Sequence, residues 1–189
     1  MDRVEEAFLK ADRMAFLPES VKGEAIFDVP VPIGFGQTNS QPTTVRLMLE
    51  WLEPEPGDKV LDVGSGSGWT TALLAYLVGP QGKVFAVERM SELVVFGQEN
   101  CSRVGVTNVK FFKAAKTMGL PKYAPYDRIL VSATADELPK GLIDQLKPKG
   151  KTVIPVGSSV LEVTKLTNGQ LAIHPHAGFT FVPLVTTHG

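Results

Sequence analysis

The segment "KVLDVGSGSGWTTALLAYLVG" (residues 59–79) decides the fold of this chain. Residues 59–64 are a short apolar run that ends in glycine, which is typical of a buried β-strand. Residues 69–79 repeat apolar side chains at helical spacing and stop at Gly79, so a helix is expected there. A buried strand, a glycine-rich turn and a helix together predict the first part of a β-α-β unit.

The same alternation continues along the chain. Further strands are expected at 83–88, 108–112, 126–133 and 151–157. Helices are expected at 91–105, where Ser91 would act as the N-cap, and at 139–150. The stretches "VLEVTKL", "TNG" and "QLAIHPH" predict an antiparallel hairpin, and "GFTFVPLV" a last strand. The expected fold is α/β and Rossmann-like, with a mostly parallel, doubly wound sheet, helices on both faces and a C-terminal antiparallel hairpin.

Length and composition limit the class of protein. A chain of 189 residues predicts a single domain, residues 1–189. Within it, 1–41 would form an irregular N-terminal arm and loop over the carboxyl edge of the sheet, and 42–189 the core. The net charge of −1 and the lack of a five-residue basic run argue against binding to nucleic acid. No apolar run approaches the roughly 18 residues of a membrane span, and the charged start does not resemble a secretory signal. We therefore expect a cytoplasmic monomer with no membrane partner.

The glycines after the first strand predict a ligand site, because ligands of such sheets bind beyond the carboxyl ends of the strands. Gly64, Gly66 and Gly68 would let the backbone approach the ligand closely. A dinucleotide-binding fingerprint needs a glycine where Trp69 stands, so we expect a nucleoside without a pyrophosphate. Glu88 ends the second strand and can accept hydrogen bonds from both ribose hydroxyls. The alternative is that Glu88 is simply an exposed carboxylate at a strand end.

Several motifs together indicate a family. The pair "VLDVGSGSG" and "VFAVE" resembles the S-adenosylmethionine-dependent methyltransferases. The stretches "DRMAFLP" (12–18), "VPIGFGQTNSQP" (31–42), "APYDRILVSATADELPKGLIDQLKPKGKTVIPVG" (124–157) and "FVPL" (181–184) are similar to the protein-L-isoaspartate O-methyltransferases. The resemblance runs from about residue 2 to residue 184. It implies an S-adenosyl-L-methionine cofactor, with S-adenosyl-L-homocysteine as its product. The implied substrate is the free carboxylate of L-isoaspartyl residues in damaged proteins or peptides, whose methyl ester closes to a succinimide and returns some normal aspartate.

The loop "IGFGQTNSQP" (33–42) is polar but uncharged, which suits such a substrate. A carboxylate with a pKa of roughly 3.5–4 is already ionised at neutral pH, so it needs orientation and no general base. The resemblance implies a catalytic role for Ser40. From the residues alone, the better interpretation is that Ser40 is the N-cap of a helix that starts near Pro42. The resemblance favours catalysis, and one serine can serve both roles.

The remaining site residues follow from the same pattern. The expected substrate-binding residues lie in the polar loop and after the fourth parallel strand: Gln37, Thr38, Asn39, Ser132, Ala133 and Thr134. The expected cofactor-binding residues lie in or near the glycine loop and after the next two strands: Asp62, Gly64, Ser65, Gly66, Ser67, Gly68, Glu88, Arg89 and Ala115.

The chain departs from the family pattern in ways that leave alternatives open. Ala115 stands where the family usually has an aspartate that binds the adenine amino group, and Asn39 replaces a usually apolar residue. The sequence also begins late relative to the family pattern and lacks most of the family's first helix. We therefore expect a divergent member. A degenerate protein that binds cofactor or protein with weak activity, and a methyltransferase for another carboxylate, remain alternatives.

The histidines and the single cysteine predict no further site. His174 and His176 would point to the same side of a strand, and His188 lies in the tail. Two aligned histidines without a third ligand are more typical of a surface than of a metal site, so no metal is expected. Cys101 excludes an intrachain disulfide and fits helix packing.

Overall fold

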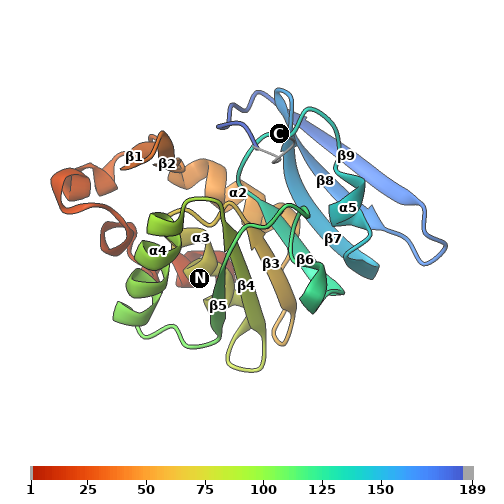
Figure 1. Ribbon diagram of the computed structural model, residues 1–189, viewed down its shortest axis with the longest axis horizontal. Coiled ribbons are helices and arrows are strands. Elements are labelled where there is room, and N and C mark those ends of the chain that lie inside the picture. The colour runs from red at the N-terminus through yellow and green to blue at the C-terminus, as the bar shows by residue number, and fades with distance from the viewer. Residues whose placement is uncertain (1, 185–189) are drawn as a thin grey trace.

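A seven-stranded sheet forms the centre of the computed structural model, which describes residues 2–184 (Figure 1). The strand order is β5-β4-β3-β6-β7-β8-β9. The first five strands in this order are parallel, and β8 and β9 continue the sheet as an antiparallel hairpin. The strands are β3 (Lys59–Val63), β4 (Lys83–Glu88), β5 (Val109–Lys113), β6 (Tyr126–Val131), β7 (Leu146–Val156), β8 (Ser159–Lys165) and β9 (Leu171–Ala177). The expected parallel sheet and C-terminal hairpin are confirmed.

Helices cover the two faces of the sheet unequally. One face carries α1 (Arg3–Lys10), α2 (Pro42–Leu52), α3 (Trp69–Val78) and α4 (Ser91–Arg103) around a buried apolar core. The other face carries only α5 (Lys140–Ile143) and the 3₁₀ turn η3 (Pro121–Tyr123) among the described elements. Aromatic rings, including Phe85 and Phe112, fill much of that second core. The helices expected on both faces are present, but the second layer is thin.

The N-terminal arm is more regular than expected. It contains α1, two 3₁₀ segments, η1 (Arg13–Phe16) and η2 (Glu19–Ile26), and a small hairpin of β1 (Val31–Gly34) and β2 (Gln37–Asn39). Asp2 accepts a hydrogen bond from the backbone N–H of Glu5, which caps α1. The helix packs on α3, and only the β1–β2 part lies over the carboxyl edge of the sheet (Figure 1).

Three local expectations were wrong. The helix expected at 139–150 ends at Ile143, because Pro148 disfavours a helical conformation at Lys147 and β7 already begins at Leu146. Ser91 is the first residue of α4, whose N-cap is Met90. The segment "GFTFVPLV" forms an isolated bridge between Pro183 and Thr134 and no strand within the described residues; its last residue, Val185, lies outside them.

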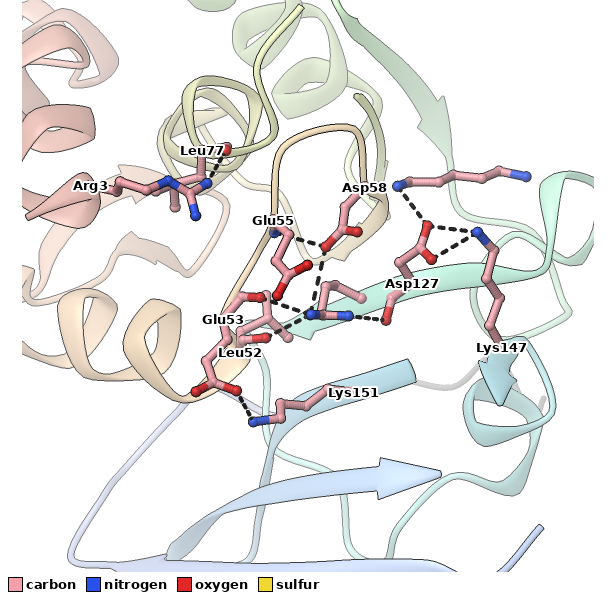
Figure 2. Close-up of polar contacts among 11 residues, drawn as sticks. Arg3, Leu52, Glu53, Glu55, Asp58, Leu77, Asp127, Lys147 and Lys151 are labelled. Carbon is pink, nitrogen blue, oxygen red and sulfur yellow. Dashed lines mark hydrogen bonds and ion pairs between the residues drawn. The ribbon is translucent and has the colours of Figure 1, made fainter. Parts of the chain in front are cut away.

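The amino ends of the strands are joined by charged side chains (Figure 2). Lys147 binds Asp127 at 2.8 Å, and Lys151 binds Glu53 at 2.6 Å. Arg128 donates from Nε to the carbonyl oxygens of Leu52 (2.9 Å) and Glu53 (3.0 Å), at the C-terminal end of α2. These contacts fasten α2 to β6 and β7 at the edge of the sheet that lies away from the glycine loop.

Two features of residues 2–184 bear on the class of protein. No helix there has the length and apolar character needed to cross a membrane. No group of three or more histidine, cysteine, aspartate or glutamate side chains is placed to hold a metal ion in the same range.

His176 stacks on Trp51 with ring centroids 3.7 Å apart, and His188 lies outside the described residues.

Candidate active site

The glycine loop connects β3 to α3 through a backbone that only glycine adopts readily. Gly64, Gly66 and Gly68 have φ angles of +80°, +51° and +86°. A Cβ on Gly68 would lie 2.8 Å from the carbonyl oxygen of Gly97 in α4, so the loop and this helix touch backbone to backbone. The loop is therefore held close to α4 while its exposed side faces the carboxyl edge.

Glu88 lies at the carboxyl end of β4 and faces this loop. Its Oε2 accepts a hydrogen bond from the backbone N–H of Gly66 (3.0 Å), and its Oε1 accepts one from Met90 (2.9 Å). Glu88 is buried, which contradicts the alternative of an exposed carboxylate. Each oxygen keeps further acceptor capacity for a ligand hydroxyl.

Asp62 is the buried acid of β3 behind the same loop. Its Oδ2 accepts hydrogen bonds from Thr70 (2.9 Å) and Thr71 (2.7 Å) at the start of α3, whereas Oδ1 has no partner among the described residues. Burial raises the pKa of Asp62 to about 6, which the two threonine hydroxyls oppose. Asp62 lines neither of the two pockets described below, so the structure places it behind the expected cofactor site rather than within it.

Two adjoining pockets open at the carboxyl edge. They share Gln37, Gly64, Glu88 and Ala133. The smaller pocket is lined by the polar loop, the glycine loop and the end of β6: Gln37, Thr38, Asn39, Ser40, Gly64, Ser65, Gly66, Ser67, Trp69, Thr70, Glu88, Ser132, Ala133 and Val182. The larger pocket is lined by the ends of β3, β4 and β5 and by the closing segment (residues 181–184): Gln37, Val63, Gly64, Val87, Glu88, Arg89, Ala114, Ala115, Lys116, Thr117, Met118, Gly119, Ala133, Pro183 and Leu184.

Ser40 lies in the smaller pocket and does not cap α2. The N-cap of α2 is Gln41, and neither its side chain nor that of Ser40 caps the first turn. Asp28, from the preceding arm, accepts hydrogen bonds from the backbone N–H (2.8 Å) and the hydroxyl (2.7 Å) of Thr43. Ser40 therefore keeps its hydroxyl available to a ligand, since the structure gives it no hydrogen-bond partner within residues 2–184.

The other expected site residues are placed unevenly. Gln37, Thr38, Ser132 and Ala133 line the smaller pocket, and Arg89 and Ala115 line the larger one. Gly68 lines neither pocket, but its close contact with Gly97 shapes the loop.

Thr134 lies outside both pockets. Its backbone N–H donates to Val182, its carbonyl accepts from Leu184, and its hydroxyl donates to Gly157. Thr134 therefore binds the closing segment and does not face either pocket.

Sequence reasoning missed two groups around the site. One is Arg13, which is buried and donates hydrogen bonds to the backbone of the polar loop. The other comprises Lys116–Gly119, Pro183 and Leu184, which line the larger pocket with Ala115, and Val182, which lines the smaller one. The motifs "DRMAFLP" and "FVPL" carried a signal for Arg13 and for the closing residues, but no local pattern predicts which residues they contact.

Comparison with known proteins identifies the family. Residues 1–189 match the family described as protein-L-isoaspartate(D-aspartate) O-methyltransferase. Enzymes named protein-L-isoaspartate O-methyltransferase from Pyrococcus horikoshii and Methanopyrus kandleri are each 46% identical over 193 residues, covering 100% of this chain and 87% and 85% of theirs.

A solved structure supports the same relation. The protein-L-isoaspartate O-methyltransferase of Plasmodium falciparum, in complex with S-adenosyl-L-homocysteine, is 30% identical with a TM-score of 0.88, over 99% of this chain and 92% of that one. Identity at this level over the whole chain means that the expected divergence was wrong. With the glycine loop, Glu88 and the polar loop gathered at one edge of a matching fold, the chain belongs to the protein-L-isoaspartate(D-aspartate) O-methyltransferase family.

Proposed function

We propose that this protein transfers a methyl group from S-adenosyl-L-methionine to the free carboxylate of L-isoaspartyl residues in damaged proteins or peptides. The observation that carries the proposal is the junction of the two pockets at Gln37, Gly64, Glu88 and Ala133. A ligand in the larger pocket can therefore present its reacting end to the smaller one. The names of the family and of the relatives support the same activity.

The residues present fit the cofactor. A pocket at the carboxyl ends of three parallel strands that includes a buried glutamate suits an adenosine group, and the glycine loop lets a ligand approach the backbone. The hydroxyl of Ser65 is buried against the smaller pocket and lacks a partner among the described residues, so it offers a polar contact there. When bound, S-adenosyl-L-methionine supplies an electrophilic methyl group whose bond to sulfur breaks as a carboxylate oxygen bonds to it.

The chain's own residues would orient the carboxylate without a general base. Glu88 is the only charged side chain that lines the smaller pocket among the described residues, and two backbone N–H groups already bind its oxygens. Ser40, Thr38 and Gln37 are neutral donors, which hold an anion without neutralising it. Their contribution is therefore alignment and the exclusion of water.

A second candidate is a methyltransferase with weak cofactor binding. Ala115 lines the larger pocket and offers no side-chain acceptor to an adenine amino group. Loss of one neutral hydrogen bond costs about 0.5–1.5 kcal/mol, which corresponds to at most roughly tenfold in affinity. This observation favours a weaker cofactor site but not an inactive protein.

Methyl transfer from labelled S-adenosyl-L-methionine to a synthetic isoaspartyl peptide tests the proposal. The matched peptide with normal aspartate is the control. We expect label in the isoaspartyl peptide alone, as an ester that base releases. Equal label in both peptides would instead support a methyltransferase for another carboxylate, and label in neither would support the degenerate alternative.

A further inference from the structure

A chain of side-chain hydrogen bonds joins the N-terminal arm, the polar loop and the glycine loop. Arg13 donates from Nε to Asn39 Oδ1 (2.8 Å), and Asn39 Nδ2 donates to Ser67 Oγ (3.1 Å). The three residues are 5%, 4% and 2% exposed. Arginine has no acceptor, so the Asn39 amide can face Arg13 only with its oxygen and must turn its NH₂ group toward Ser67. The direction of this series of hydrogen bonds is therefore fixed by the donors and acceptors of its side chains.

Arg13 holds the polar loop by its backbone as well. Its Nη2 donates to the carbonyl oxygens of Val29 (2.7 Å), Asn39 (3.2 Å) and Ser40 (3.0 Å), and its Nη1 donates to the carbonyl oxygen of Phe27 (2.9 Å). Burial lowers the pKa of Arg13, and its guanidinium has no carboxylate at ion-pair distance among residues 2–184. Of its five hydrogen bonds, three go to Asn39 and Ser40, so Arg13 holds the backbone of Ser40 and the side chain of Asn39 together; the other two bind the arm at Phe27 and Val29.

Ser67, the last residue in this series of hydrogen bonds, lies in the other half of the site. Ser67 belongs to the glycine loop and lines the same pocket as Ser40. Asn39 directly precedes Ser40, so one amide side chain spans the distance between the loop that would hold the carboxylate and the loop that would hold the methyl donor. If either loop shifts, these hydrogen bonds break or the other loop moves with it.

We propose that Asn39 is a positioning residue that couples the polar loop to the glycine loop and so sets the carboxylate in line with the methyl donor. This inference rests on the proposed function for what the two loops bind. Asn39 itself needs to touch neither substrate. Loss of its amide should slow turnover through misalignment while leaving the Michaelis constant for the cofactor within about twofold, because the cofactor contacts remain.

A double-mutant cycle tests the coupling. Asn39→Leu keeps the side-chain size and removes both hydrogen bonds, and Ser67→Ala removes only the second. We expect each to lower kcat by about tenfold, and the double variant to be no slower than the slower single variant. The matched control pairs Asn39→Leu with Ser65→Ala, since Ser65 is buried in the same loop but has no bond to Asn39. In that control pair, the fold losses in kcat of the two single variants should multiply in the double variant.

Multiplying losses in both pairs would overturn the coupling. A readout independent of turnover separates this failure from failure of the proposed function. We expect S-adenosyl-L-homocysteine to slow amide exchange at residues 38–41 by about threefold or more in the unmodified protein, and less in both Asn39→Leu and Ser67→Ala. Equal slowing in all three proteins contradicts the coupling even if methylation is absent. Lack of methylation with the expected exchange pattern contradicts only the proposed function.

Discussion

Ser40 is the residue on which the chemistry depends most directly. Replacement of Ser40 by alanine removes an orienting hydrogen bond to a carboxylate, worth about 1.5–3 kcal/mol, so turnover should fall about ten- to a hundredfold. Because Asp28 caps α2, the free energy of unfolding should hardly change. Steady-state kinetics and urea denaturation of Ser40→Ala measure the two effects.

Ser40→Gly provides the control for the capping alternative. Glycine is a tolerable N-cap but lacks the hydroxyl. A Ser40→Gly protein with full turnover would show that the hydroxyl is not part of the chemistry.

Glu88 should govern cofactor affinity. Glu88→Ala removes a buried acceptor at the junction of the pockets, so the affinity for S-adenosyl-L-homocysteine should weaken by at least about 1.5 kcal/mol, or roughly tenfold. Calorimetry measures the change. Glu92, an exposed acid in the first turn of α4, provides the matched control, and Glu92→Ala should bind normally. Equal affinities in the two variants would remove Glu88 from the site.

Asp62 should make stability depend on pH. Its folded pKa of about 6 lies above its ordinary value of 3.8, so the folded state retains a proton that the unfolded state has lost between these values. The stabilisation is complete below the unfolded pKa and is lost as the pH rises through about 6. Urea denaturation should therefore show Asp62→Asn gaining stability relative to the unmodified protein from pH 4 to about pH 6–7. A difference that stays constant over this range would contradict the assignment.

At the scale of elements, Asp28 anchors the start of α2 from outside the helix. Asp28→Ala should lower the free energy of unfolding at neutral pH by about 0.5–2 kcal/mol, the usual loss for a helix cap. The backbone N–H of Thr43, its hydroxyl and Gln41 lower the pKa of Asp28. The stabilisation is present above the unfolded pKa near 3.8 and disappears as the pH falls through the lower folded value.

Chemical denaturation at pH 7 and at pH 2 checks this cap. Asp28→Asn keeps an acceptor for Thr43 and should lose less than Asp28→Ala at pH 7. A loss in Asp28→Ala that is as large at pH 2 as at pH 7 would show that the carboxylate is not its cause.

The elements differ in how far sequence could predict them. The strands 59–63 and 83–88 were predictable because both are apolar runs that end at the carboxyl edge. Helix α1 was missed although Asp2 and Glu5 form the start of a capping pattern. The Arg13 contacts with residues 27–40 were not predictable, since they join segments up to 27 residues apart.

At the scale of the whole molecule, the two edges of the sheet have different roles. Ion pairs such as Lys147–Asp127 fasten the amino edge (Figure 2). The carboxyl edge carries both pockets. The N-terminal arm reaches from α1 on one face to the hairpin above the carboxyl edge, so it brings the polar loop to the glycine loop. The sequence predicted the two loops, and the fold explains why they lie next to each other.

We infer that the junction of the pockets selects an isoaspartyl carboxylate over an aspartyl one. The most direct measurement is the ratio of kcat/KM for two peptides that differ only in an isoaspartyl or aspartyl linkage at one position. We expect a base-labile methyl ester on the isoaspartyl peptide and a ratio of at least about a hundredfold, equivalent to roughly 2.7 kcal/mol in transition-state stabilisation. A ratio near one, with both peptides methylated, would contradict it.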